Sequence, residues 1–246
     1  MNGKIEYIGK TLLIETELGE KILVFGDIHF GMEGNLRGLS FEVKLRERIL
    51  DGFEEIFEKV GKVDRVIFLG DLKHNFSGIA REEWRDVLGM FDYIKDYCKR
   101  IIVIKGNHDN FLMNIISKWE KDNPGRDIRL VDYYVNEGFC FLHGDRDFEE
   151  IHSKEIKYWI MGHAHPAVVL REKKGIKSEK YKCFLVGKFK RKNVVIVPSF
   201  IEYKEGSDPR DSAYKLAWDF NLGKFDVKII GENLEVLDFG KLRDLD

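Results

Sequence analysis

The chain of 246 residues contains no glutamine, only three cysteines and four prolines, and no apolar run long enough to cross a membrane. Cys98, Cys140 and Cys183 stand singly in apolar stretches without CxxC spacing, which favours buried, reduced thiols over a disulfide framework. The first twenty residues are interrupted by charges and lack the apolar core of a signal peptide. We therefore expect a cytoplasmic protein that does not associate with membranes.

A strong net charge is also absent, because 41 lysine or arginine residues accompany 43 aspartate or glutamate residues and the net charge is −2. No global field therefore attracts the protein to nucleic acid or to an anionic membrane. Charged residues make up 34% of the chain, and this abundance together with the lack of glutamine is typical of proteins from thermophiles. Hydrophobic residues make up 43%, which is enough for one well-buried core.

What the sequence does contain is histidine in short, glycine-flanked clusters. Six of the seven histidines lie in such clusters, and only His152, which we expect at the surface, lies outside them. Imidazole, carboxylate and amide oxygen together form a ligand set for borderline divalent metals. The pattern therefore predicts a metal site built from five clusters: GDIH at 26–29, GDLKH at 70–74, GNHD at 106–109, HGD at 143–145 and GHAH at 162–165.

Each cluster directly follows a short run of β-branched and aromatic residues. Because these runs show no polar alternation, they predict strands buried on both faces, at 22–25, 66–69, 101–104, 139–142, 158–161 and, before a proline, 194–197. Apolar residues at three- and four-residue spacing predict helices over 41–60, 82–98 and 110–120 that pack against the sheet. Since ligands of α/β sheets bind beyond the carboxyl ends of the strands, we expect the five clusters to converge.

The last third of the chain has a different character. Strand-like runs at 167–170, 181–186, 194–200, 214–220 and 225–230 alternate with turns rich in glycine and lysine. They predict a second sheet that packs on the first. Because no linker rich in proline or serine divides the chain, we expect a single domain over residues 1–246, with the motifs within 22–166 and the second sheet completed by 167–246.

The spacing within the clusters indicates how cations would be held. Asp27 and His29, two residues apart on an extended segment, would point the same way and bind one ion. Asp71 carries two carboxylate oxygens and could bridge two ions. The further candidate ligands are Asn107, His143, His163 and His165. Seven ligands are more than one metal site needs, so we expect two sites that share Asp71.

The ordered set D-x-H, G-D, G-N-H-D, H and G-H-x-H resembles the calcineurin-like metallophosphoesterases over residues 22–166. The resemblance implies a four-layer α/β/β/α sandwich of two mixed sheets flanked by helices. It also implies a hydrolase in which a metal-bound hydroxide attacks phosphorus in line between two ions. One ion would take Asp27, His29 and His165, the other Asn107, His143 and His163, with Asp71 bridging.

Three further residues receive roles near these ligands. By the resemblance, His108 is the catalytic histidine that binds no metal, and it suits protonation of the leaving oxygen. His74 stands in a GDLxH pattern similar to that of SbcD-type repair nucleases, and we hypothesise that it contacts phosphate. Asp109 is a candidate for orienting His108.

The expected reaction is hydrolysis of a phosphodiester. The alternatives are an SbcD-related nuclease acting on DNA or RNA, a phosphomonoesterase or nucleotide pyrophosphatase, and a non-catalytic metal-binding scaffold. All seven ligand positions are filled and His108 is present, which argues against the scaffold. Manganese is the metal expected from the resemblance, although Zn, Fe, Ni and Co suit the same donor atoms. Nothing in the sequence indicates an oligomeric state.

A basic segment at 171–192 bears on the substrate. It contains ten lysine or arginine residues and two glutamates, with aromatic residues interleaved. One interpretation is a surface that holds a nucleic-acid backbone beside the metals. The other is a solvated hairpin with its tip near 174–176. The two differ in the salt dependence of nucleic-acid binding that they predict.

Overall fold

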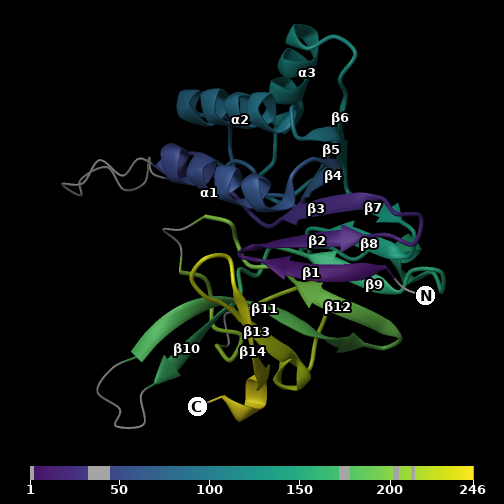
Figure 1. Ribbon diagram of the computed structural model, residues 1–246, viewed down its shortest axis with the longest axis vertical. Helices are drawn as coiled ribbons and strands as arrows, with labels where there is room; N and C mark the ends of the chain where they lie inside the picture. The colour runs from purple at the N-terminus through teal and green to yellow at the C-terminus, as the bar shows by residue number, and fades with distance from the viewer. Residues whose placement is uncertain (1–2, 33–44, 172–177, 202–204, 212–213, 246) are drawn as a thin grey trace.

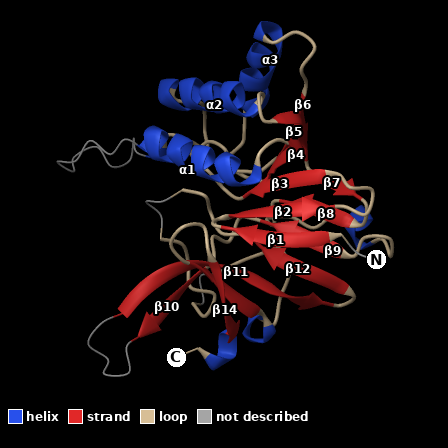
Figure 2. Cartoon of the chain, in the orientation of Figure 1, coloured by secondary structure: helices blue, strands red, loops and turns tan. Residues whose placement is uncertain are grey.

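The computed structural model describes residues 3–32, 45–171, 178–201, 205–211 and 214–245, and they form two mixed β-sheets packed face to face (Figure 1). The α-helices of the described residues all lie on one side of this pair of sheets (Figure 2). The sandwich of two mixed sheets expected from the sequence is confirmed.

The first sheet has the order β1-β2-β3-β4-β5-β6. Strands β3 to β6 run parallel, whereas β1 and β2 add an antiparallel edge that the sequence patterns did not predict. The strands are β1 (Lys4–Ile8), β2 (Thr11–Glu15), β3 (Lys21–Phe25), β4 (Val63–Phe68), β5 (Cys98–Ile104) and β6 (Ile128–Val131).

The second sheet has the order β14-β13-β11-β12-β9-β8-β7, and β10 pairs with β11. Strands β8, β9 and β12 run parallel in its centre, so their carboxyl ends lie at one edge. The strands are β7 (Tyr133–Asn136), β8 (Phe139–Leu142), β9 (Tyr158–Met161), β10 (Ala167–Arg171), β11 (Ser178–Phe189), β12 (Lys192–Ile196), β13 (Asp226–Ile230) and β14 (Val236–Lys241).

The helices α1 (Leu45–Val60), α2 (Arg81–Ile94) and α3 (Leu112–Asp122) cover the outer face of the first sheet (Figure 1). Their apolar stripes form one core with that face, in which the rings of Phe53 and Phe25 meet edge to face. Residues 41–44 of the first predicted helix lie outside the described residues. Helix α2 ends at Ile94, not at Cys98, because Cys98 begins β5.

The inner faces of the two sheets form a second core. Val24 and Ile67 of the first sheet pack in one cluster with Phe141 and Ile160 of the second. All four side chains are 0% exposed, which explains why their strands lack polar alternation. This packing fixes the relative position of the two sets of loops that follow the strands.

The outer face of the second sheet differs from the expectation of helices on both sides. In the described part of the chain, 3-10 helices (Glu149–His152, Leu222–Lys224 and Leu242–Asp244) and loops cover it. The strand predicted over 214–220 is wrong, because alternate side chains such as Trp218 and Phe220 pack flat onto this face. Among the described residues, no helix has the length and apolar character needed to cross a membrane.

Candidate metal centre

All seven candidate ligands lie in loops that directly follow strands. Asp27 and His29 follow β3, Asp71 follows β4, and Asn107 follows β5 in the first sheet. His143 follows β8, and His163 and His165 follow β9 in the second sheet. The two sheets therefore bring their carboxyl-end loops to one place between them, as expected for an α/β crevice.

The glycines of the clusters are required because the loops approach one another closely. A Cβ atom on Gly106 would lie 2.2 Å from Oδ1 of Asp71, and one on Gly162 would lie 2.6 Å from Oδ2 of Asp27. Both distances are too short for a carbon atom. The glycines therefore allow each carboxylate to lie against the backbone of a neighbouring loop.

Four candidate ligands have a left-handed backbone, which non-glycine residues rarely adopt. Their φ values are 53° for His29, 49° for Asp71, 67° for His163 and 45° for His165. Such residues cost about 1–3 kcal/mol each and cluster at functional sites. The expectation that Asp27 and His29 lie on a regular extended segment is therefore wrong, since the chain turns at His29.

Asp27, His29 and His165 form the first ligand group. Nε2 of His165 lies 3.3 Å from Oδ1 of Asp27 and 3.3 Å from Nε2 of His29. The three residues are buried, at 0%, 2% and 4% exposure. Buried polar atoms this close to one another need either a hydrogen or a cation between them.

Asp71, His143 and His163 form the second group. Nε2 of His143 lies 3.0 Å from Nδ1 of His163 and 3.1 Å from Oδ1 of Asn107. Asn107 thus belongs to the same group and contributes a neutral amide oxygen.

Asp71 lies between the two groups. Its Oδ2 atom is 3.6 Å from Nε2 of His29 and 3.5 Å from Nε2 of His143. Its other oxygen, Oδ1, accepts a hydrogen bond of 2.9 Å from the backbone N–H of His108. One carboxylate oxygen therefore faces both sets of imidazoles while the other is held in place.

The donor set suits a cation. Nδ1 of His143 donates to the carbonyl of Leu69 at 2.7 Å, so when the ring is neutral its lone pair is on Nε2. That lone pair faces Oδ1 of Asn107 and Oδ2 of Asp71, which are both acceptors. Three converging acceptors repel one another unless a positive charge lies among them, and a divalent metal ion meets this need.

The electrostatics of the cluster follow from burial and mutual charge. Burial alone would raise the pKa of Asp27, but the nearby His165 and His143 lower it well below its ordinary value. Burial lowers the pKa of His29 to about 3, so its ring is neutral and can act as a ligand. Burial would also lower the pKa of His143, yet its bond to Asp71 and the Asp27 charge raise it to about 10. Without a bound cation, a proton on His143 therefore supplies the positive charge between the carboxylates, and a metal ion would replace that proton.

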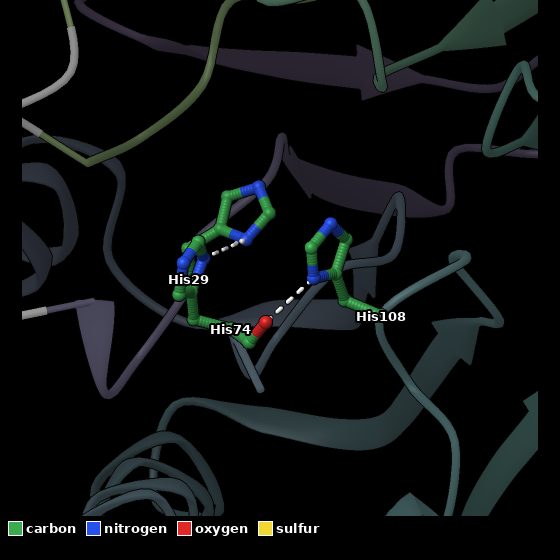
Figure 3. Close-up of side chains that lie close together, drawn as sticks. All are labelled: His29, His74 and His108. Carbon is green, nitrogen blue, oxygen red and sulfur yellow. Dashed lines mark hydrogen bonds between the residues drawn. The ribbon is translucent and has the colours of Figure 1, made fainter. Parts of the chain in front are cut away.

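His74 and His108 lie beside His29 at the partly exposed border of the first ligand group, which we call the rim (Figure 3). Nδ1 of His108 donates to the backbone carbonyl of His74 at 2.6 Å. Nδ1 of His74 lies 3.4 Å from Nδ1 of His29, and the ring of the exposed Phe76 meets that of His108 edge to face at 5.7 Å. The half-buried His74 and His108 rings thus border the first ligand group.

The hydrogen bonds of the Asp109 carboxylate go to backbone N–H groups and not to the ring of His108, so its role in orienting His108 stays a prediction. Its buried carboxylate accepts backbone N–H groups of Asp71 at 2.7 Å, of Leu72 at 2.9 Å and of Gly106 at 3.0 Å. Burial and the charge of Asp71 raise its pKa to about 6. Asp109 therefore ties the loops after β4 and β5 together, and the carbonyl of His74 takes the partner role at His108.

Sequence reasoning missed two buried charged residues beneath the rim. Lys73, 0% exposed, donates from Nζ to the carbonyls of Asn75 and His108. Glu83, 1% exposed, accepts the N–H of His74 at 2.9 Å and of Asn75 at 2.5 Å. The only sequence signal is Glu83 at the third position of α2, where a glutamate commonly reaches back to cap the helix.

Two solved structures align with most of the chain. A nuclease of Pseudomonas putida, designated MPE, matches with a TM-score of 0.61 at 18% identity, covering 97% of this chain and 100% of that chain. An archaeal phosphodiesterase matches with a TM-score of 0.42 at 16% identity, covering 89% of this chain and 98% of that chain. No curated protein sequence matches the chain.

A family model described as calcineurin-like phosphoesterase matches residues 20–229, which include every candidate ligand. The family consists of phosphoester hydrolases that use divalent metals, and the histidine and aspartate groups at this site could bind such ions. The match extends over most of the chain and over both sheets. The chain belongs to the calcineurin-like phosphoesterase family.

Proposed function

We propose that this protein is a phosphodiesterase with two divalent metal ions, held on either side of Asp71. The proposal rests on the position of Oδ2 of Asp71, which lies 3.6 Å from Nε2 of His29 and 3.5 Å from Nε2 of His143. A single carboxylate oxygen so placed suits two ions better than one. We also propose that the whole chain acts as one catalytic domain.

Each ion would have its own set of protein ligands. Bound there, the two ions would act as Lewis acids on the phosphoryl group and supply the nucleophile at neutral pH. Manganese is our first choice because of the family resemblance, although Zn, Fe, Ni and Co suit the same donor atoms. One set is Asp27, His29 and His165, the other is Asn107, His143 and His163, and Asp71 is common to both.

We assign His108 as the general acid. Because Nδ1 donates to the carbonyl of His74 at 2.6 Å, the exchangeable proton of the charged ring lies on Nε2. That proton can pass to the leaving oxygen of a bound ester. Lys73 supports this role, since its ammonium group holds the carbonyl of His108. His74 remains our candidate for contacting phosphate, through its ring beside His29.

The rim favours a diester over a monoester. Phe76 and Phe111 are each 57% exposed, and Phe76 contacts the ring of His108. The side-chain amide of Asn110 donates to the carbonyl of Phe76 at 3.3 Å, which joins the two loops that carry these rings. Exposed aromatic rings beside the general acid would hold an apolar or aromatic leaving group, which a simple monoester need not have.

The same rings make a nuclease the second candidate. Nucleobases stack on exposed aromatic side chains in proteins that bind single strands, and the structurally similar Pseudomonas putida protein is a nuclease. A nuclease would cleave oligonucleotides far faster than a small aryl diester. A general phosphodiesterase would cleave both.

A metal-reconstitution assay tests the proposal. Purified protein is stripped of metal, loaded with Mn²⁺ and assayed on bis(p-nitrophenyl) phosphate, p-nitrophenyl phosphate and single-stranded DNA. We expect metal-dependent turnover of the diester that exceeds that of the monoester, and loss of turnover in Asp71→Asn. Turnover that does not depend on metal, or that Asp71→Asn retains, would disprove the proposed function.

A further inference from the structure

A cavity of about 550 Å³ lies at the end of the second sheet opposite the histidine clusters. Its wall includes Lys157 and Trp159 at the start of β9, and Lys192 at the start of the parallel strand β12. His163 and His165 follow the other end of β9, so the length of the strand, about 13 Å, separates the cavity from the metal centre. The volume is typical of sites for small ligands.

The cavity is strongly basic. No acidic side chain lines it in the described part of the chain, and no ion pair among the described residues neutralises its five lysine or arginine side chains. The carboxylate of Asp147 pairs with the lining residue His152 at 2.8 Å. In a chain of net charge −2, such a gathering gives the cavity a local positive potential that attracts anions. The five cations are Lys154, Lys157, Lys190, Arg191 and Lys192.

The floor of the cavity is held rigidly. Lys192 is 7% exposed, and its Nζ donates to the carbonyl of Ile156 at 2.8 Å and to that of Ser153. The indole N–H of the fully buried Trp159 donates to the carbonyl of Ile151 at 3.0 Å. Burial and the nearby charge of Lys157 lower the pKa of Lys192. Lys154 and Arg191 are exposed at the mouth.

Only one end of the basic segment 171–192 reaches this cavity. Strand β11 pairs with β10 at Ser178 and with β12 at Phe189. About 35 Å of extended chain separates these two ends. Of this segment, only the carboxyl-terminal end contributes to the cavity. Residues 172–177, the predicted hairpin tip, lie outside the described residues.

We propose that this cavity binds a ligand with several phosphate groups, either a free nucleoside polyphosphate or the phosphorylated end of a nucleic-acid strand. Several full charges around one concave site match a polyanion better than a single carboxylate. Arg191 offers planar, paired donors and the lysines offer point charges, as is usual in phosphate sites. The cavity lacks the carboxylate and imidazole clusters of the metal centre, so it binds without hydrolysing, and its ligand need not be the substrate.

Isothermal titration calorimetry of the full-length protein with sodium tripolyphosphate tests this inference. A chelator is present so that the metal centre contributes no phosphate site. The cavity variant is Lys154→Glu with Arg191→Glu, because both side chains are exposed and neither forms a hydrogen bond or ion pair with the part of the chain that the structure describes. The control is Lys59→Glu with Lys62→Glu, which changes the net charge equally at two exposed lysines near the end of α1.

We expect the cavity variant to bind tripolyphosphate at least about tenfold more weakly than wild type, since each lost charged contact has an effect of this order. The control should bind like wild type. Competition by ATP alone would identify a free polyphosphate as the ligand, and competition by a 5′-phosphorylated oligothymidylate would identify a strand end. Equal weakening in both double variants, or no binding by wild type at millimolar concentration, would overturn the inference.

Metal-dependent hydrolysis of the small diester separates this inference from the proposed function. The cavity variant should hydrolyse bis(p-nitrophenyl) phosphate at the wild-type rate, because none of its substitutions is near a metal ligand. A loss of tripolyphosphate binding with full hydrolysis therefore tests the cavity alone. If the cavity variant lost hydrolysis and binding together, the cavity would not be an independent site and the inference would fail.

Discussion

At the scale of single residues, the two histidines at the rim differ in what they contact. His108 bonds the carbonyl of His74 through Nδ1 and takes no part in the two main ligand groups. His74 faces His29 with a ring nitrogen at 3.4 Å. A substitution at His108 should therefore affect proton transfer, whereas a substitution at His74 should also disturb a metal ligand.

Replacing His108 tests the general acid. We expect His108→Asn to bind both metals but to lose about 10²–10⁴-fold in kcat, the usual contribution of a general acid. Metal content by mass spectrometry and kcat on the diester measure the two effects. His152→Asn, outside the site, should behave like wild type. A fully active His108→Asn protein would remove this histidine from the mechanism.

Phe76 tests the role of the aromatic rim. We expect Phe76→Ala to raise KM for dinucleotide substrates by about tenfold with little change in kcat, because base stacking contributes equally to substrate and transition state. Phe239→Ala removes a similarly exposed ring, 40% exposed on β14, and serves as the matched control. If KM were the same for both variants, the rim would have no part in substrate binding.

At the scale of elements, the loops after the strands depend on glycine at points of close approach. Ala at position 106 would place a Cβ atom 2.2 Å from Oδ1 of Asp71. We expect Gly106→Ala to displace Asp71, to weaken metal binding by at least about tenfold and to lower Tm, since overpacking costs about 1–3 kcal/mol. Equilibrium dialysis with Mn²⁺ and thermal unfolding measure these changes.

Gly78→Ala is the matched control, because no atom lies within 4 Å of its added Cβ. It should bind metal and unfold like wild type. Wild-type metal binding by Gly106→Ala would show that Asp71 can move without cost to the site.

The six predicted runs of apolar residues are found as strands, because strands buried on both faces have an unbroken apolar signature. Strands β1 and β2 were missed: β1 is a five-residue edge strand that alternates polar and apolar residues, and β2 is a five-residue strand whose Leu12 and Ile14 are fully buried. The run 214–220 alternates like a strand, yet its apolar side chains cover a sheet face without pairing.

The metal ligands of the candidate site could be predicted from the sequence because histidine, aspartate and asparagine residues gather there in short clusters beside glycine. The structure brings the seven predicted side chains together, since each follows a strand end at the same edge. The contacts of Asp109, Lys73 and Glu83 could not be predicted, because charged residues are ordinarily exposed and only the fold reveals that these three are buried.

At the scale of the whole molecule, the metal centre lies where the two sheets meet, so its occupancy should affect global stability. We expect removal of metal to lower Tm by about 5–10 °C. A ligand at a hundredfold excess over its Kd adds about 2.7 kcal/mol to the free energy of unfolding. In a protein of this length, each kcal/mol shifts Tm by about 2–4 °C. Scanning calorimetry with and without chelator measures the shift, and re-addition of Mn²⁺ should reverse it. An unchanged Tm would contradict tight binding at the sheet interface.

The central claim is that Asp71 is shared by two cations, and anomalous X-ray diffraction from crystals of the manganese-loaded protein tests it most directly. We expect two anomalous peaks, one beside His29 and His165 and one beside His143 and His163, both in contact with Oδ2 of Asp71. A single peak, or two peaks that Asp71 does not join, would contradict the account.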